Sequence, residues 1–401
     1  MGVIRISARE ARLRRKVREQ LRALGYTKSA GGVLIPPSLD KDSYRVLHLP
    51  QREARLEKDA RFLAARQTAL IRHFAAGPEV DLRRFRVRLE LVETETWQAE
   101  LFRFATLLWS IPVSQGFGRR LRYLVWDDST GRLAGLFALT DPVFNLRARD
   151  EEIGWTADDR SDRLIYLMDG YVVGAVPPYS RILGGKLIAC LLRSKEVVSD
   201  FRDKYGGTDG VISGKSKNAH LVAITTTSAL GRSSVYNRLR LGGTKYLTPV
   251  GYTSGYGHFH FPDTLFAEMR AYLKAKRDTY EKNNRFGDGP NWKMRAIRRT
   301  LQLLGMNPAL LKHGLARQVF MGFLADNAVA VLQGKKNKPS YGSLLSAADI
   351  GEAAAERWMR PRAGRDPRYL SVSRDEILRQ MLLRPQASGA ETGGKQGVLR
   401  Y

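Results

Sequence analysis

The sequence of 401 residues contains a single cysteine, Cys190, and no long apolar run. One cysteine excludes both a disulfide framework and a cysteine-based zinc site. No apolar stretch approaches the roughly 20 residues that a membrane-spanning helix needs. The first residues, MGVIRISAREARLRRK, also lack the apolar segment of a secretory signal. We therefore expect a cytoplasmic protein without a membrane partner.

Several motifs of catalysis are missing as well. The chain has no Walker motif, no His-Glu-x-x-His helix and no convincing nuclease-type cluster of carboxylates. His258 and His260 would share one face of an extended segment, but two histidines make only half a metal site. No carboxylate or cysteine lies at ligand spacing beside them. We expect no metal ion, and any ATP-driven step must come from a partner protein.

What the chain does contain is positive charge, with a net charge of +27 and a pI near 10.3. Residues 1–88 hold 21 Lys+Arg against 9 Asp+Glu, and residues 271–401 hold 24 against 11. Residues 89–270 are almost balanced, at 22 against 20. Two basic flanks favour a polyanionic partner, because each neutralised phosphate releases condensed counterions.

We predict from these flanks that the chain binds nucleic acid, with DNA preferred. A solvated basic surface and an anionic membrane surface are the alternatives, but no strongly amphipathic helix with an aromatic face accompanies the charge. The cations expected to contact phosphates are Arg12, Arg15, Lys16, Arg18, Arg298, Arg299, Lys335 and Lys336.

Hydrophobic periodicity divides the chain into a basic helical module over residues 1–84, an α/β core over 85–262 and a basic helical region over 263–385. Helices are predicted over residues 8–24, 51–75, 97–109, 186–204, 264–282, 292–304 and 315–332. Strands are predicted over residues 85–92, 121–126, 133–139, 164–168, 171–176 and 221–227. A hairpin turn is expected at residues 127–131, and residues 386–401 are predicted to be a disordered tail.

Two turns rich in small residues, at residues 180–186 and 228–234, follow apolar strands of the core. The first turn opens an apolar helical run, and unpaired N–H groups at a helix start attract anions. Glycines allow a phosphate to approach such N–H groups closely. The alternatives are a plain strand-to-helix turn with surface charge, and helix capping by Ser233 and Ser234. The two turns together indicate a site for an anionic ligand.

The first turn resembles the pyrophosphate-binding turn of GNAT-type acyltransferases, since Arg181 and Gly184 match that motif. Lys186 departs from it by replacing a small residue. The resemblance implies a GNAT-like core whose cofactor is an acyl-CoA or another phosphate-bearing ligand. It also implies that Tyr236, in a following helix, is the general acid, with core packing as the alternative. The residues expected to bind the cofactor are Arg181, Gly184, Gly185, Lys186, Arg232, Ser233, Ser234 and Asn237.

Two carboxylates, Asp150 and Glu152, are candidates for a general base. In an alternating strand they would share one face, and partial burial would raise the pKa of such an acid toward the working range. The alternative is a structural salt bridge from Asp150 to Arg147 or Arg149. The sequence leaves both interpretations open.

A closer resemblance covers about residues 120–262. The segments Leu-Arg-Ala-Arg-Asp-Glu-Glu-Ile-Gly-Trp at 146–155, Thr-Ser-Ala-Leu-Gly-Arg-Ser-Ser at 227–234 and Gly-Tyr-Thr-Ser-Gly-Tyr-Gly at 251–257 are similar to the Druantia anti-phage system protein A family. The resemblance implies a prokaryotic defence role directed at phage DNA or its replication, together with other defence subunits. It supplies no agreed catalytic mechanism.

Three hypotheses follow from these observations. The first is a nucleic-acid-binding component of an anti-phage system, with basic flanks around a GNAT-like core. The second is a CoA-dependent acyltransferase-type enzyme that modifies nucleic acid, a nucleotide or a protein. The third is a catalytically inactive scaffold for other defence subunits.

Overall fold

A computed structural model of the chain describes residues 7–30, 33–38, 40–207, 219–282 and 291–382. The predicted disordered tail at 386–401 lies outside the described residues. None of the described helices is long and apolar enough to cross a membrane.

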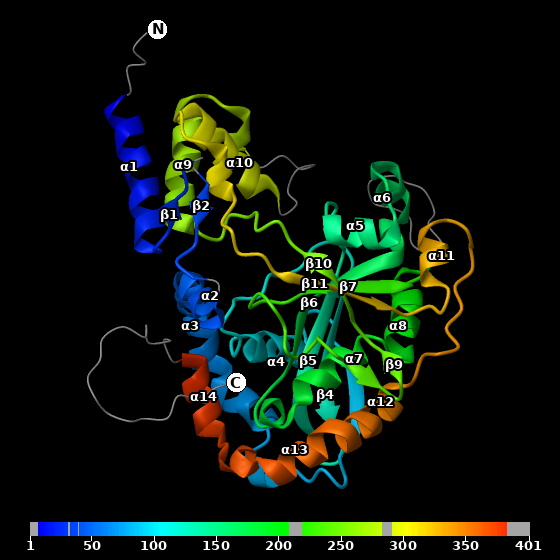
Figure 1. Ribbon diagram of the computed structural model, residues 1–401. Coiled ribbons are helices and arrows are strands. Elements are labelled where there is room, and N and C mark those ends of the chain that lie inside the picture. The colour runs from blue at the N-terminus through cyan, green and yellow to red at the C-terminus, as the bar shows by residue number, and fades with distance from the viewer. Residues whose placement is uncertain (1–6, 31–32, 39, 208–218, 283–290, 383–401) are drawn as a thin grey trace.

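A seven-stranded mixed sheet lies at the centre of the molecule (Figure 1). Its strands in spatial order are β10 (Thr248–Tyr252), β11 (Gln318–Phe323), β7 (Ala223–Thr227), β6 (Leu167–Ala175), β5 (Arg132–Thr140), β4 (Arg120–Asp127) and β3 (Val87–Leu91). All neighbouring strands run antiparallel except β6 and β7, which are parallel. The predicted mixed α/β class is therefore confirmed, as is the hairpin that joins β4 to β5.

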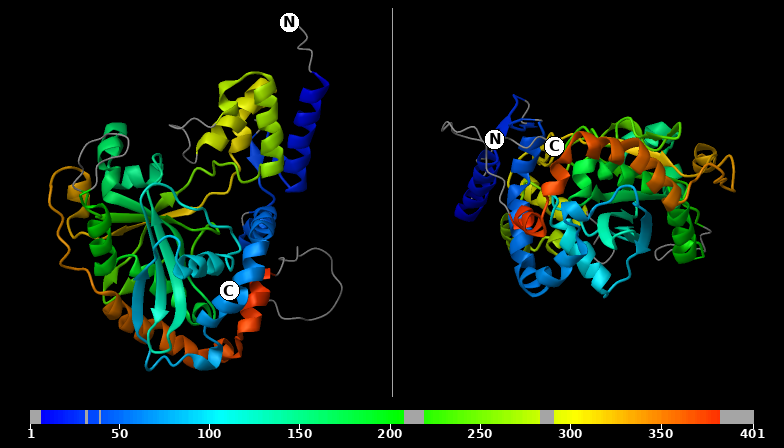
Figure 2. Two further views of the ribbon diagram at one scale, coloured as in Figure 1. Left: turned by 180° about the vertical axis from the view of Figure 1, so that it is seen from behind. Right: turned by 90° about the horizontal axis from the view of Figure 1, so that it is seen from below.

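Helices cover both faces of this sheet (Figures 1 and 2). Successive side chains of a strand point to opposite faces, so along β5 Phe137 enters one core while Leu136 and Ala138 enter the other. The helices that contribute to the first core are α7 (Gly184–Leu191), α8 (Lys195–Tyr205) and α12 (Ala347–Ala354). Those that contribute to the second core are α3 (Leu49–Leu70), α4 (Trp97–Thr106) and α14 (Arg374–Leu382).

A separate helical unit stands beyond one end of the sheet and combines two distant parts of the chain (Figure 1). Its members are α1 (Ala8–Ala23), the hairpin β1 (Thr27–Lys28) and β2 (Leu34–Ile35), α9 (Asp263–Ala275) and α10 (Asn291–Leu303). Leu13, Val17 and Leu21 of α1 share one apolar core with Met269 and Leu273 of α9. Parts of the two basic flanks of the sequence thus meet in one body.

The helix predicted over 315–332 is wrong. Residues Gln318–Phe323 form β11, which lies between β7 and β10, and only Ala328–Leu332 is helical, as α11. A strand buried on both faces is a continuous apolar run, which periodicity alone cannot distinguish from a buried helix. The domain boundaries predicted at residues 84 and 262 remain predictions. One strand of the sheet, β11, comes from the region after residue 262.

Four histidines gather where the helical unit joins the sheet. The ring of His48 lies 4.2 Å from that of Phe259, and the rings of His260 and His313 lie 5.8 Å apart. Arg317 approaches His48, with Nη2 and Nε2 3.1 Å apart. Burial lowers the pKa of His48, His258 and His260 to about 4 and that of His313 to about 3, so all four rings are neutral at pH 7.

Mild acid is therefore expected to destabilise the fold through this histidine cluster. Below about pH 6.5, the usual histidine pKa, the histidines of the unfolded chain bind protons that the buried histidines do not. The free energy of unfolding therefore falls as the pH falls from about 6.5 toward 4. By pH 5 the loss is about 2 kcal/mol for each fully buried histidine. Thermal melts at pH 7.5 and 5 measure it, and a His260→Gln/His313→Gln variant should lose less between the two. Equal melting temperatures of the wild type at both pH values would contradict this expectation.

Candidate functional site

One cavity of about 460 Å³ is lined by both turns identified in the sequence, at residues 180–186 and 228–234. It lies at the point where β6 and β7 separate. The strands pair from Leu167 and Ala223 only as far as Gly170 and Thr226, while β6 continues along β5 to Ala175. Val173, Gly174 and Ala175 therefore lie on the cavity wall. In open parallel α/β sheets ligands bind beyond the carboxyl ends of the strands, and here the cavity lies at that end of the parallel pair β6–β7.

A β-bulge accompanies this separation. Leu139 pairs with Gly170 and Ala138 pairs with Val172, so that Tyr171 is the extra residue on β6. A bulge bends its strand and redirects the side chains that follow it. The bulge lies at the point beyond which β6 no longer pairs with β7.

The first turn ends in the amino-terminus of α7, where Leu183 and Gly185 line the cavity. Leu183 has a φ of 66°, an unfavourable conformation for a leucine, and no side chain caps the helix. A Cβ on Gly184 would lie 2.7 Å from the carbonyl oxygen of Tyr179, so that glycine is needed for packing. A Cβ on Gly185 would meet only Val235, at 3.8 Å. Gly185 thus leaves the helix terminus open to a ligand.

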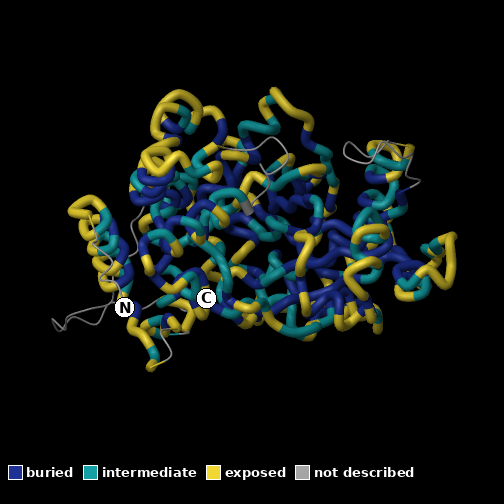
Figure 3. The backbone as a smooth tube through the Cα atoms, turned by 90° about the horizontal axis from the view of Figure 1, so that it is seen from above, coloured by how far each residue is buried: buried dark blue, intermediate teal, exposed yellow. Residues whose placement is uncertain are grey.

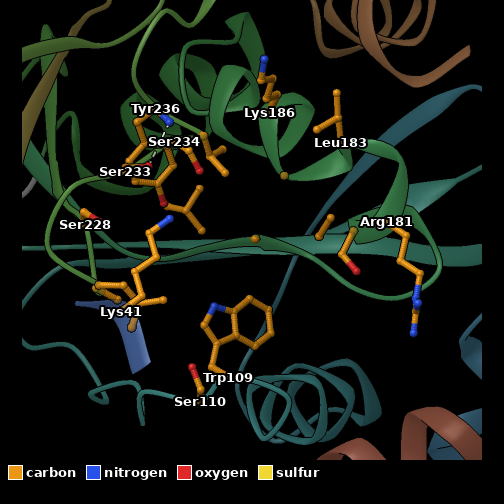
Figure 4. Close-up of a pocket in the computed structure, with 18 of the residues that line it drawn as sticks. Lys41, Trp109, Ser110, Arg181, Leu183, Lys186, Ser228, Ser233, Ser234 and Tyr236 are labelled. Atoms are coloured by element: carbon orange, nitrogen blue, oxygen red, sulfur yellow. Dashed lines mark hydrogen bonds between the residues drawn. The ribbon is translucent and has the colours of Figure 1, made fainter. Parts of the chain in front are cut away.

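Two residues predicted to hold the ligand's phosphates direct their charges elsewhere. The Arg181 guanidinium donates to Glu376 of α14 at 2.6 Å and points away from Lys41 and Trp109 (Figure 4). The Lys186 ammonium lies 5.2 Å from the ring centre of Trp358 and also points away from Lys41 (Figure 4). Burial and the neighbouring Arg357 lower the pKa of Lys186. Both residues form part of the wall, but neither charge is directed at the middle of the cavity.

The helix expected after the second turn is wrong, because residues 229–238 form successive turns and bends. Ser233 Oγ accepts the Tyr236 N–H at 3.0 Å, and the Asn237 amide donates to the Ser233 carbonyl at 2.5 Å. Asn237 also donates to Gln318 of β11 at 3.0 Å. Ser233 and Asn237 therefore brace the turn against the sheet, while Arg232 and Ser234 stay exposed at the cavity.

Tyr236 lines the cavity with its ring edge against Phe320, at a centroid distance of 5.3 Å. Burial raises the pKa of Tyr236 above its usual value, which favours the protonated phenol at neutral pH. Its hydroxyl has no hydrogen-bond partner among the described residues. The side chain therefore contacts the core and also lines the cavity, and its role as a general acid stays a prediction.

The cavity is strongly basic. Seven cations line it, namely Lys41, Arg45, Arg181, Lys186, Arg232, Arg362 and Arg368. Asp366 is the one carboxylate among its described lining residues, and it pairs with Arg362 and Arg368 at 2.8 and 2.7 Å. Lys41 and Arg232 form no ion pair with any described residue. These two charges are available to an anion.

Lys41 and Trp109 are among the lining residues that sequence reasoning missed. Lys41 comes from α2 (Lys41–Leu47) and extends toward Ser234 and Tyr236 (Figure 4). Trp109 packs on β6, where a Cβ on Gly174 would lie 2.6 Å from its ring. Neither residue belongs to a recognisable motif, and both reach the cavity only through long-range packing.

The predicted general bases do not reach this cavity. Asp150 and Glu152 lie on helix α5 (Arg147–Ile153) and not on a strand, so residues two apart cannot share a face. Asp150 pairs with Arg149 at 2.7 Å and with Arg160 at 2.9 Å, while Glu152 is exposed. The salt-bridge alternative is thus confirmed for Arg149, whereas Arg147 pairs with Glu151 instead.

The predicted nucleic-acid contacts divide into three groups. Arg12, Arg15, Arg18 and Arg298 are exposed on the helical unit. Lys16 and Arg299 belong to the same unit but are paired, with Glu268 at 2.5 Å and Asp278 at 2.7 Å. Lys335 and Lys336 follow α11 on the opposite side of the molecule (Figures 1 and 2). The last two lysines therefore cannot extend the surface formed by the others.

No group of three or more His, Cys, Asp or Glu residues with metal-binding geometry occurs in the part of the chain that the structure describes. His258 and His260 lie in a bend and turn at 258–261 and not in the extended segment considered from the sequence. His260 Nε2 instead bonds the Leu310 carbonyl at 2.7 Å.

Comparison with known proteins gives two consistent matches. A family profile described as Druantia protein DruA matches residues 38–334. A protein of Escherichia coli (strain UMEA 4076-1) named Druantia protein DruA is 53% identical over 367 residues, which cover 92% of this chain and 91% of that protein. A search of solved structures found no significant match.

Proposed function

Because the chain belongs to the Druantia protein DruA family, we propose that it is a nucleic-acid-binding component of an anti-phage defence system. Such a system implies other subunits, and the ATP-driven step that this sequence lacks would belong to one of them. The observation that carries the nucleic-acid part is the outer face of α1.

That outer face carries a stripe of four exposed arginines, Arg12, Arg15, Arg18 and Arg22. Residues three and four apart lie on one side of a helix, so the stripe extends about 15 Å along α1. Of these four arginines, Arg15 alone forms an ion pair with a described residue, Glu19, at 3.7 Å. Figure 3 shows α1, beside the N-terminus, exposed on its outer side and buried toward the molecule. Free arginines at this spacing suit a phosphate backbone, which they recognise in bidentate fashion.

The experiment that tests this proposal is a titration of a fluorescent DNA duplex with the full chain at several salt concentrations. A surface that binds phosphates must lose affinity as salt rises, because salt reduces the entropy gained from counterion release. An affinity that does not change with salt would overturn the proposal.

A second candidate function, transfer from an acyl-CoA or other phosphate-bearing donor, is favoured by the cavity at the β6–β7 separation. The parallel pair with α7 beginning beside it supports the GNAT-like interpretation of the core. A phosphate would meet the α7 terminus beside Gly185, with Lys41 and Arg232 as counter-charges. Tyr236 is the one predicted acid–base group that lines the cavity. Asp150 and Glu152 supply no base there.

Lys41→Glu and Arg232→Glu are each expected to weaken CoA binding about 10-fold, since each places a negative charge where a charge-assisted contact is expected. Isothermal titration of CoA and acetyl-CoA into the full chain measures this. Arg181→Gln is the matched control and should change the affinity less than about 2-fold, because its charge is already paired with Glu376. Absence of binding to the folded wild type would overturn this second candidate and would favour a catalytically inactive scaffold, without affecting the first.

A further inference from the structure

We infer that a second cavity, enclosed by α3, α4 and the start of β4, binds a single-stranded segment of nucleic acid. This inference rests on the proposed nucleic-acid binding and adds a site to it. The cavity has a volume of about 760 Å³ and shares none of the cations of the first cavity. Three of its cations come from α3 in the first basic flank and three from the nearly neutral middle of the sequence, so the charge of the flank alone did not indicate the site.

Cations outnumber carboxylates on its walls. The cations are Arg55, Lys58, Arg66, Arg103, Arg120 and Arg122, and the carboxylates are Asp59, Glu95 and Glu100. Asp59 pairs with both Arg55 and Arg103, and Glu100 pairs with Arg66. Lys58, Arg120 and Arg122 form no ion pair with any residue that the structure describes. These three charges remain for phosphates.

Aromatic rings lie among these charges. Trp97 is 43% exposed, and its ring stacks on His73 at a centroid distance of 4.7 Å with an interplanar angle of 19°. The stacking holds an exposed ring in place on the cavity wall. Phe102 and Tyr171 also line the cavity, with Arg122 6.0 Å from the ring centre of Phe102. Phe102 is only 6% exposed, so Trp97 is the ring that offers a stacking face. Single-strand sites combine exposed rings, on which bases stack, with cations that contact the backbone.

Cavity size favours a single strand over a duplex. The volume falls within the range of about 300–1,000 Å³ that is typical of small-ligand sites, so one or two nucleotides fit and a double helix does not. An acidic peptide would satisfy the cations but would make no use of an exposed tryptophan beside them. The combination of stacking surface and unpaired cations therefore favours nucleotides.

The second cavity lies close to the first along β6. The bulged residue Tyr171 lines the second cavity, whereas Val173, Gly174 and Ala175 line the first. Trp109 lines the first cavity, and Val113, four residues later, lines the second. A strand bound at Trp97 and Tyr171 would thus lie next to the cavity that is proposed to hold an anionic donor.

The test is fluorescence anisotropy with the full chain and labelled dT12, rU12 and a DNA duplex. Trp97→Ala and Arg120→Ser/Arg122→Ser are each expected to weaken single-strand binding about 10-fold and to leave duplex binding within about 2-fold. Trp97→Phe should restore most of the single-strand affinity, because phenylalanine also stacks. Arg83→Ser, at an exposed arginine outside the cavity, is the matched control and should bind like the wild type.

Two kinds of result would overturn the inference, and they are distinguishable. Unchanged single-strand affinity in both variants, or binding of a polyglutamate peptide in place of dT12 and rU12, would overturn the site while leaving duplex binding intact. Failure of the wild type to bind any of the three nucleic acids would overturn the proposed function as well. Binding of either dT12 or rU12 that the two variants weaken supports the site, and the tighter of the two identifies the preferred sugar.

Discussion

A variant with Arg12, Arg15, Arg18 and Arg298 all changed to glutamate is expected to bind a DNA duplex at least about 100-fold more weakly at 100 mM salt. Each substitution removes a phosphate contact and adds a repulsive charge, so the effect exceeds simple loss of four contacts. All four side chains are exposed, and the apolar core of the helical unit is made by other residues. The variant should therefore fold, which circular dichroism and a thermal melt would verify.

The dependence of the DNA affinity on salt concentration tests this prediction quantitatively. The wild type should lose about 10³-fold in affinity between 50 and 200 mM salt if six phosphates are engaged. In the variant the slope of log affinity against log salt should be smaller by about 3 to 4. Lys335→Glu/Lys336→Glu is the control, because these exposed lysines lie on the opposite side of the molecule. An equal loss in that control would show that total charge, and not the surface of the helical unit, governs binding.

Arg149→Ala is expected to lower the free energy of unfolding by about 3–5 kcal/mol, the cost of removing one partner from a buried ion pair. The Arg149 side chain is fully buried. It donates to the carbonyls of Val143 and Phe144 at 2.7 and 2.9 Å and to Asp150 at 2.7 Å. Its removal leaves these oxygens without a donor, and Arg160 alone must then neutralise Asp150.

Urea unfolding of the wild type and the variant measures this difference. Arg147→Ala is the matched control, two residues away on the same helix, with an 88% exposed side chain that pairs with Glu151. Its cost should stay below about 1 kcal/mol, as for other exposed ion pairs. Arg149→Lys should still be destabilised, since a point charge cannot replace the planar fork that bridges three acceptors. A loss in Arg149→Ala as small as that in Arg147→Ala would contradict the structural role.

The segment at 146–155 illustrates what the sequence left open. Its carboxylates could have shared a face of a strand as a catalytic pair, or Asp150 could have formed a salt bridge with a neighbouring arginine. The structure makes it a helix whose Arg149 and Asp150 form a buried network. Nothing in the local pattern of residues distinguishes a buried structural ion pair from a catalytic carboxylate.

The sequence by itself determined the local elements and the composition of the surfaces. Two apolar runs joined by a turn signal predicted the β4–β5 hairpin, helical spacing predicted α1, and small residues beside arginines located the two turns of the cavity. Each of these elements depends on residues close together in the chain, and the spacing and type of those residues indicate the conformation that they adopt. The excess of positive charge was visible in the same way.

Only the tertiary structure decided which of these pieces meet. It joined α1 to α9 across some 250 residues, inserted β11 into the sheet, brought Lys41 and Trp109 into the cavity, and turned Arg181 toward Glu376. Such contacts form because apolar faces from separate segments must be buried against one another. The sequence of one segment does not specify which of many possible apolar faces covers it. The direction of a charged side chain depends on the partner that the completed fold places beside it, and no local pattern encodes that partner.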